Sequence, residues 1–277
     1  MASQIRILNN NAADRATLSA STTSGSLVVD NLKTDYKAAV YRSTGTTTTI
    51  TATWASNETI GVVVVPFCNL TATATMRVRL FTNTGDASPA YDSGNVLAGA
   101  SVPTDAWEWG STPLGVNAYS YVGAAYGRCY TTPTVCRKME VIIIDTSNAS
   151  GYVEAARLVC GNYYNPENDA DIDVGIEFPE NSVSTRNDAS DLITDVGTRT
   201  KKLSFNLNNM TIADRNKILA ILKSNGTSRP MFISLMANDG DITNEQHYQI
   251  YGKLAQNTAV SIAYWQGYMS AISIEEC

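Results

Sequence analysis

The sequence predicts a mainly β protein in two parts: a β-sandwich over residues 1–164, followed by a smaller α+β domain over residues 165–277 with one main helix. Three observations predict this class. Runs of β-branched and alternating apolar residues recur through the first 160 residues. A polar, acidic stretch at residues 162–173 then interrupts them and predicts a boundary or a long connection. After it, one segment with helical periodicity lies between strand-like runs.

The N-terminal part contains five predicted strands. They cover residues 46–54, 59–67, 75–81, 138–144 and 152–159. The third strand alternates most clearly, with Met76, Val78 and Leu80 on one face and arginines on the other. A turn at Ser56-Asn57 separates the first two strands, and the last strand is expected to point Glu154 and Arg157 outward.

The C-terminal part is predicted to form a sheet with one helix packed on it. The expected strands are residues 202–207, 230–235, 248–254 and 269–274. Thr211 and Asp214 form a variant of the capping box and start a helix over residues 212–223, which Gly226 ends. Ile218, Leu219 and Leu222 are expected on its apolar face.

Composition narrows the function classes. The chain has 277 residues, of which 44% are hydrophobic and 17% charged, with a net charge of −6. This balance suits packed cores and gives no electrostatic footprint for nucleic acid or an anionic membrane surface. The longest apolar run, residues 62–67, is far shorter than the roughly 20 residues that span a bilayer. The first residues lack the apolar segment of a signal peptide, so we expect synthesis in a cytoplasm without export by that route.

No motif identifies a catalytic, cofactor or metal site, and the chain is predicted not to be an enzyme. The five cysteines include no CxxC pair, and all are expected to be reduced; a bridge between Cys129 and Cys136 is the alternative. The single histidine, His247, has no adjacent nucleophile motif and is expected to be a surface or interface residue. Asp169, Asp171 and other acids in residues 167–173 are interpreted as linker charge, with cation binding the alternative.

An aromatic-rich stretch supplies the candidate contact residues. They are Trp107, Trp109, Tyr119, Tyr121 and Tyr126, in or beside a loop-rich segment. Three interpretations are open: the rings cover the end of the core, anchor a protein interface, or stack on sugars.

Two passages resemble proteins of bacteriophage tails. Residues 31–79 contain Tyr41-Arg42-Ser43, a Gly-headed apolar run at 61–67, Asn69-Leu70 and an Arg-alternating run at 76–81. This order resembles the galactose-binding-like (discoidin-type) β-sandwich found in phage tail proteins. Residues 195–235 are similar to the strand–helix–strand core of tail-tip proteins, and residues 7–21 to the start of the same group.

The resemblance implies a structural component of the virion, similar to a distal tail or baseplate protein. Such a protein is expected to form a homo-oligomeric ring between the tail tube and the tip, and to contact other tail proteins. The alternative is a carbohydrate-binding adhesin at the tail tip, which would bind a host surface glycan through the aromatic loop. The galactose-binding-like fold does not itself imply sugar binding, and no binding residue is carried over from the family.

Overall fold

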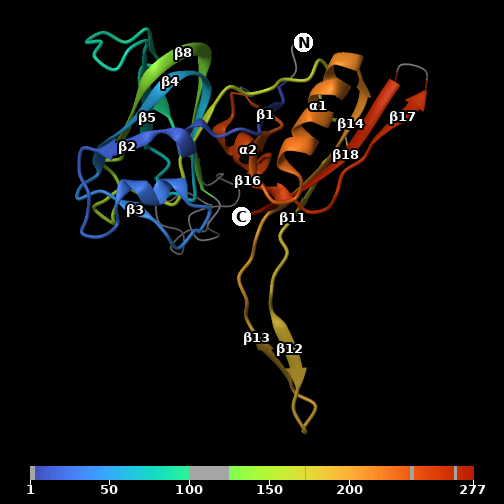
Figure 1. Cartoon of the computed structure of the whole chain (residues 1–277). Coiled ribbons are helices and arrows are strands. Elements are labelled where there is room, and N and C mark those ends of the chain that lie inside the picture. The colour runs from blue at the N-terminus through green and yellow to red at the C-terminus, as the bar shows by residue number, and fades with distance from the viewer. Residues whose placement is uncertain (1–3, 100–124, 172, 238–239, 265–266) are drawn as a thin grey trace.

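The computed structural model describes residues 4–99, 125–171, 173–237, 240–264 and 267–277. Two antiparallel sheets lie side by side, and a long hairpin projects from the second one (Figure 1). The mainly β fold class is confirmed. No helix among these residues is long and apolar enough to cross a membrane.

The first sheet is built around two unusually long strands. In spatial order it contains β10 (Val159–Gly161), β4 (Thr47–Pro66), β8 (Tyr126–Ile144), β5 (Thr75–Phe81) and β6 (Tyr91–Asp92), with β2 (Thr17–Ala20) beside β4 and β7 (Val96–Leu97) beside β5. A two-stranded sheet, β3 (Tyr41–Arg42) with β9 (Glu154–Ala155), and the 3-10 helices η1 (Ala12–Arg15) and η2 (Val29–Lys33) complete this part. Its core joins sheet residues such as Ile50 and Val78 to Leu32 of η2.

Strand β4 corrects the prediction of two separate strands at residues 46–54 and 59–67. Ser56 and Asn57 do not end the strand, because the pairing of β4 with β8 shifts register between Thr53 and Glu58 and again between Ile60 and Val62. Such irregularities absorb extra residues and bend the strand without ending it. The predicted strand at residues 75–81 is confirmed as β5.

The second sheet combines strands from both ends of the chain. In spatial order it contains β1 (Arg6–Leu8), β15 (Met231–Ser234), β16 (Gln249–Leu254), β18 (Gly267–Glu276), β14 (Lys202–Met210) and β11 (Gly175–Glu177), with β17 (Val260–Tyr264) beside β18. The pairing of β1 with β15 places Arg6 opposite Ser234. The predicted boundaries 1–164 and 165–277 did not include this crossing of the N-terminal strand into the C-terminal sheet.

The main helix, α1 (Ile212–Asn225), starts as the sequence predicts. Thr211 and Asp214 form the capping box, and Gly226 follows the helix with a positive φ of 52°. Ile218 is buried, but Leu219 is 45% exposed, which corrects its assignment to the apolar face. The buried positions recur at intervals of three and four residues from Asp214, and Leu219 lies outside that stripe. A second, short helix, α2 (Ile242–His247), was not predicted.

Candidate functional site

The structure describes one of the five predicted aromatic contact residues. Trp107, Trp109, Tyr119 and Tyr121 lie outside the described residues. Tyr126, at the start of β8, is fully buried and packs in an apolar cluster that joins the two sheets. Its ring is enclosed by other residues of this chain, which is the position that the core interpretation describes.

Tyr126 connects the two parts through hydrogen bonds as well as packing. Its hydroxyl donates to Glu276 Oε1 at 3.2 Å and accepts from the Tyr251 backbone N–H at 2.9 Å. Phe67 and Phe232 lie 5.8 and 6.4 Å from its ring, between ring centroids. Burial raises the pKa of the phenol well above its ordinary value, so it stays protonated and can keep donating.

Arg157 forms a second connection between the parts. The sequence placed it on the outside of a strand at residues 152–159, but it is 3% exposed, because that segment divides into β9 and β10 with Arg157 between them. Its guanidinium lies 2.8 Å from an Asp14 carboxylate oxygen and 3.3 Å from one of Asp35. It also donates to the Tyr251 hydroxyl at 3.0 Å. Removing one member would leave a buried charge without its partner, so this cluster fixes how the two sheets meet.

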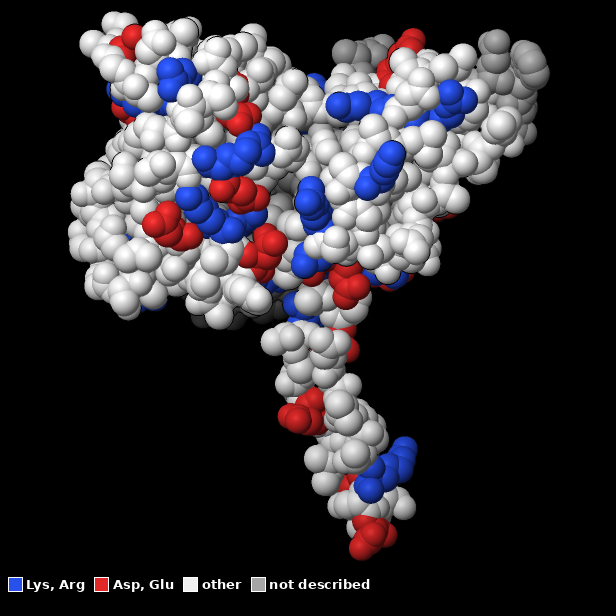
Figure 2. Space-filling model, in the orientation of Figure 1, with Lys and Arg blue, Asp and Glu red and all other residues white. Residues whose placement is uncertain are grey.

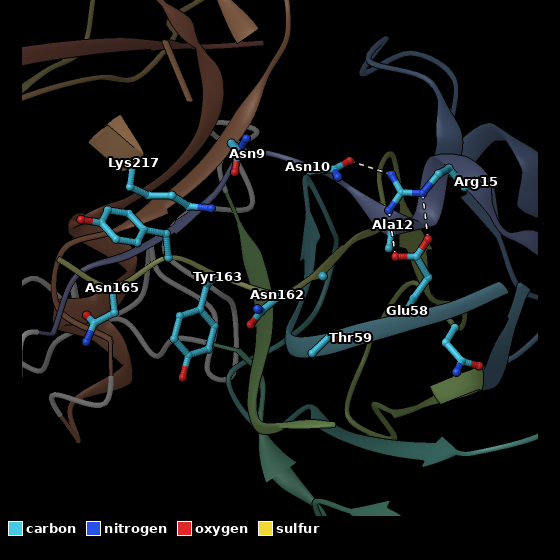
Figure 3. Close-up of a pocket in the computed structure, with 13 residues that line it drawn as sticks. Asn9, Asn10, Ala12, Arg15, Glu58, Thr59, Asn162, Tyr163, Asn165 and Lys217 are labelled. Atoms are coloured by element: carbon cyan, nitrogen blue, oxygen red, sulfur yellow. Dashed lines mark hydrogen bonds and ion pairs between the residues drawn. The ribbon is translucent and has the colours of Figure 1, made fainter. Parts of the chain in front are cut away.

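A polar cleft of about 600 Å³ lies along this junction (Figure 3). Its polar lining comes from the segment after β1, from η1, β4 and α1, and from the chain after β10: Asn9, Asn10, Arg15, Asn57, Glu58, Asn162, Asn165 and Lys217. Figure 3 shows Lys217 and Asn165 on one side and Arg15 and Glu58 on the other. The cleft therefore exists only because the two sheets are assembled next to each other.

The cleft lining contains two cationic side chains, Arg15 and Lys217, and one carboxylate, Glu58. Arg15 and Glu58 form a two-pronged ion pair, with both N···O distances 2.9 Å, and Arg15 also donates to Asn10 Oδ1 at 2.6 Å. No carboxylate among the described residues lies within 4 Å of Lys217 Nζ, which sits 6.0 Å from the centroid of the Tyr164 ring. The exposed side-chain amides of Asn57 and Asn162 form no hydrogen bond within the described part of the chain. One cation and several amide donors and acceptors thus face the solvent in the cleft.

Tyr163 forms one wall of the cleft and packs closely against Gly61 of β4. A Cβ atom at Gly61 would lie 3.0 Å from Tyr163 Cε1, so any larger residue would push this ring outward by a few tenths of an ångström. Arg6 lies over the Tyr163 ring at 4.7 Å from its centroid and donates to Asn165 Oδ1 at 2.6 Å. Because Arg6 stacks on the tyrosine, this ring offers its edge and hydroxyl to a ligand more readily than its face.

The projecting hairpin is the second candidate site. It extends the pairing of β11 with β14 and ends in β12 (Val183–Arg186) and β13 (Leu192–Asp195), far from both sheets (Figure 1). We name residues 178–199 the arm. The Glu180–Arg199 ion pair, at 2.7 Å, closes its base. A Cβ atom at Gly197 would lie 2.3 Å from the Asn181 carbonyl, so glycine allows the two segments of the arm to pack closely against each other.

The arm exposes apolar side chains with no core to cover them. Phe178, Val183, Leu192, Ile193 and Val196 are 46–76% exposed, and Figure 2 shows an arm surface that is mostly uncharged. Cross-strand partners share a face, so the Thr185–Ile193 and Val183–Asp195 pairs lie on one face, and the Arg186–Leu192 pair lies on the other. A two-stranded hairpin in water is marginally stable by itself, which makes exposed apolar residues here unusual for an isolated chain.

Two carboxylates of the acidic stretch accept hydrogen bonds from other segments of the chain. Asp169 Oδ1 accepts from the Gln4 backbone N–H, and Asp171 Oδ2 accepts from the Asn208 side chain, both at 2.7 Å. Among the described residues, no group of three or more potential metal ligands occurs. His247, the last residue of α2, is half-buried, and its pKa is lowered by burial and by Lys201.

The five cysteines are all in described positions, and none is joined to another. Cys129 and Cys136, the alternative disulfide pair, lie on the same strand, β8. Burial raises the pKa of the Cys68 thiol to about 11 and that of Cys136 to about 12, so both stay protonated at neutral pH.

No family model matches the chain, and no curated protein matches it. Similar solved structures include the family 32 carbohydrate-binding module of NanJ from Clostridium perfringens in complex with galactose, at 10% identity and a TM-score of 0.37, covering 58% of this chain and 99% of that one. They also include a fucose-binding module from Streptococcus pneumoniae, at 11% identity and a TM-score of 0.37, covering 56% of this chain and 96% of that one.

Modules of this kind have the galactose-binding-like β-sandwich, the class expected for the N-terminal part. At this identity and TM-score the similarity carries no argument about what this chain binds. Neither name refers to a phage tail, so the resemblance seen in the sequence has no counterpart in these comparisons.

Proposed function

We propose that this chain is a structural protein that works by assembly, and that it forms part of a ring at the distal end of a bacteriophage tail, between the tail tube and the tip. Its partners would be further copies of itself and neighbouring tail proteins, and its final location the virion. The role requires rigid β domains and contact surfaces and no chemistry, which agrees with the prediction that the chain is not an enzyme. The phage setting rests on the sequence passages at residues 31–79 and 195–235.

The arm is the observation that carries the assembly role. It presents apolar side chains such as Val183 (62% exposed) and Ile193 (55% exposed) beyond the body of the protein. Apolar surface of this kind gains free energy only when a partner removes it from water. An arm that leaves one subunit also reaches a neighbour naturally, and contacts of this head-to-tail kind close into rings when the rotation permits.

Replacing residues 182–196 with a short glycine-containing turn tests the proposal. The replacement removes neither of the apolar cores of the two sheets, so the melting temperature of the subunit should change little. The concentration needed for oligomerisation should rise strongly, as measured by mass photometry and by electron-microscopy class averages. Rings formed by the shortened chain at the wild-type concentration would contradict the role given to the arm.

A second candidate is carbohydrate binding, and the polar cleft favours it. Amide, guanidinium and ammonium groups around a cavity of about 600 Å³ are suited to sugar hydroxyls, which both donate and accept hydrogen bonds. This function would sit beside assembly, because the cleft and the arm share no residue. Binding of a glycan to the chain without the arm, measured by calorimetry, would support it; the next subsection specifies the ligand.

A further inference from the structure

We infer that the cleft between the two sheets binds an acidic saccharide, with the Lys217 ammonium on its carboxylate and the Asn57 and Asn162 amides on its hydroxyls. This inference rests on the carbohydrate-binding candidate above and is independent of the assembly role. It follows from the charge, the hydrogen-bonding groups and the shape of the cleft, taken in turn.

The charge of the cleft favours one negative group on the ligand. Glu58 neutralises Arg15 through two contacts of 2.9 Å, while no described carboxylate pairs with Lys217. The net charge of the chain is −6, so the excess positive charge of the cleft is opposite in sign to the charge of the whole molecule. A single carboxylate on the ligand would match Lys217, whereas a strongly charged polyanion would find only one unpaired cation.

The remaining groups favour hydroxyls over aromatic rings. The Asn57 and Asn162 amides each offer two donors and an acceptor, and neither is engaged within the described residues. Arg6 lies over one face of the Tyr163 ring and Lys217 over one face of the Tyr164 ring, so a cation already occupies a stacking face of each tyrosine. A saccharide fits this set, because its hydroxyls can donate to an amide oxygen and accept from an amide nitrogen at the same time.

The start of α1 argues against a phosphate ligand. Helix N-termini often bind phosphate through unpaired backbone N–H groups. Here the capping box of Thr211 and Asp214 occupies that end, and Asp214 adds a negative charge. Tyr164 also donates to the Asp214 carboxylate. The cation available in the cleft is therefore the Lys217 side chain, one turn further along the helix.

Isothermal titration of the full chain with a disaccharide of one galacturonic acid and one galactose unit tests the inference, with the neutral galactose disaccharide and inorganic phosphate as comparison ligands. The acidic disaccharide should bind more tightly than either. Lys217→Gln should weaken its binding about tenfold, the effect of losing a charge-assisted hydrogen bond, and should leave the weak binding of the neutral sugar unchanged. Asn162→Ala should weaken both sugars.

Lys223→Gln is the matched control, since Lys223 is exposed on the same helix and does not line the cleft. Equal effects of Lys217→Gln and Lys223→Gln would overturn the assignment, as would absence of binding or equal affinity for the two disaccharides. Phosphate binding as tight as the acidic sugar, and equally dependent on Lys217, would show a simple anion site and overturn it as well. Each of these failures would leave assembly through the arm untouched, because Lys217→Gln does not alter the arm.

Discussion

The arm provides the most direct test of how this protein works, through a paired substitution of Val183 and Ile193 by serine. The two residues lie on the same face of the hairpin and are 62% and 55% exposed. Full burial of such a side chain contributes about 1.5–3 kcal/mol, so burying the exposed portion of each contributes roughly 1–1.5 kcal/mol. The double variant should therefore lose about 2–3 kcal/mol of association free energy per arm contact.

That loss corresponds to a roughly 30- to 150-fold weaker association, at about 1.4 kcal/mol for each factor of ten. Mass photometry over a concentration series measures the shift directly. The melting temperature of the subunit should stay nearly unchanged, because substitutions at exposed positions seldom alter stability by more than about 0.5 kcal/mol. Ile262→Ser is the matched control: Ile262 is an apolar residue on β17, 72% exposed and remote from the arm in sequence.

Three results would refute the reasoning. Assembly of the double variant at the wild-type concentration would mean that this face of the arm is not an interface. An equal effect of Ile262→Ser would mean that general surface polarity, and not the arm, controls association. A wild-type chain that remains monomeric at every concentration would exclude self-assembly and would overturn the proposed ring.

Four further predictions concern the body of the protein. Burial lowers the pKa of Lys201 from 10.5 to about 8, so as the pH rises the folded chain loses this proton before the unfolded chain does. Between pH 8 and 10.5 the free energy of unfolding of the wild type should therefore rise by up to about 3 kcal/mol relative to that of Lys201→Met. Urea titration at a series of pH values measures this difference. Ile218→Ala should cost about 2–5 kcal/mol of stability and Leu219→Ala less than about 1 kcal/mol, since only Ile218 is buried. Thiol titration of denatured, unreduced protein should find five free cysteines. Trp109→Ala should weaken oligomerisation by roughly 2–4 kcal/mol if that ring anchors an interface, and should instead lower the melting temperature if it belongs to the core.

The elements that could be predicted from the sequence are those set by local rules. Strand β5 follows the alternation of Met76, Val78 and Leu80, and all three side chains are buried. Helix α1 begins where Thr211 and Asp214 indicate, because a capping box joins residues only three positions apart. In each case the signal and the structure it specifies lie within one short segment.

The features that could not be predicted depend on residues far apart in the sequence, or on tertiary contacts that outweigh the local sequence preference. Ser56 and Asn57 have a turn-like composition, yet β8 holds them inside a single strand. Strand β1 is three residues long, and its partner Ser234 lies more than 220 positions away from Arg6, so no local pattern identifies it. The cleft likewise draws its lining from several separate segments and has no sequence signature.

The arm was missed for a different reason. Its many Asn, Asp and Ser residues have a composition typical of a linker, and no strand was predicted there. A hairpin signal was nevertheless present: β-branched residues stand on both sides of the polar turn at 187–190, and Asn187 Oδ1 accepts from the Ala189 and Asp191 backbone N–H groups. Weighing turn chemistry against composition would have predicted strands here.

The direction of the arm matters for the proposed ring. The arm leaves the second sheet at β11 and β14, and its base is paired through the Glu180–Arg199 bridge and ion pair. The sheet that carries it is joined to the first part by β1, by the Arg157–Tyr251 hydrogen bond and by the Tyr126 contacts. A head-to-tail ring closes only if every subunit places its contact surface at the same angle to the next one. In the proposed ring, the buried polar contacts between the sheets would supply that constant angle, and they would then serve assembly as well as stability.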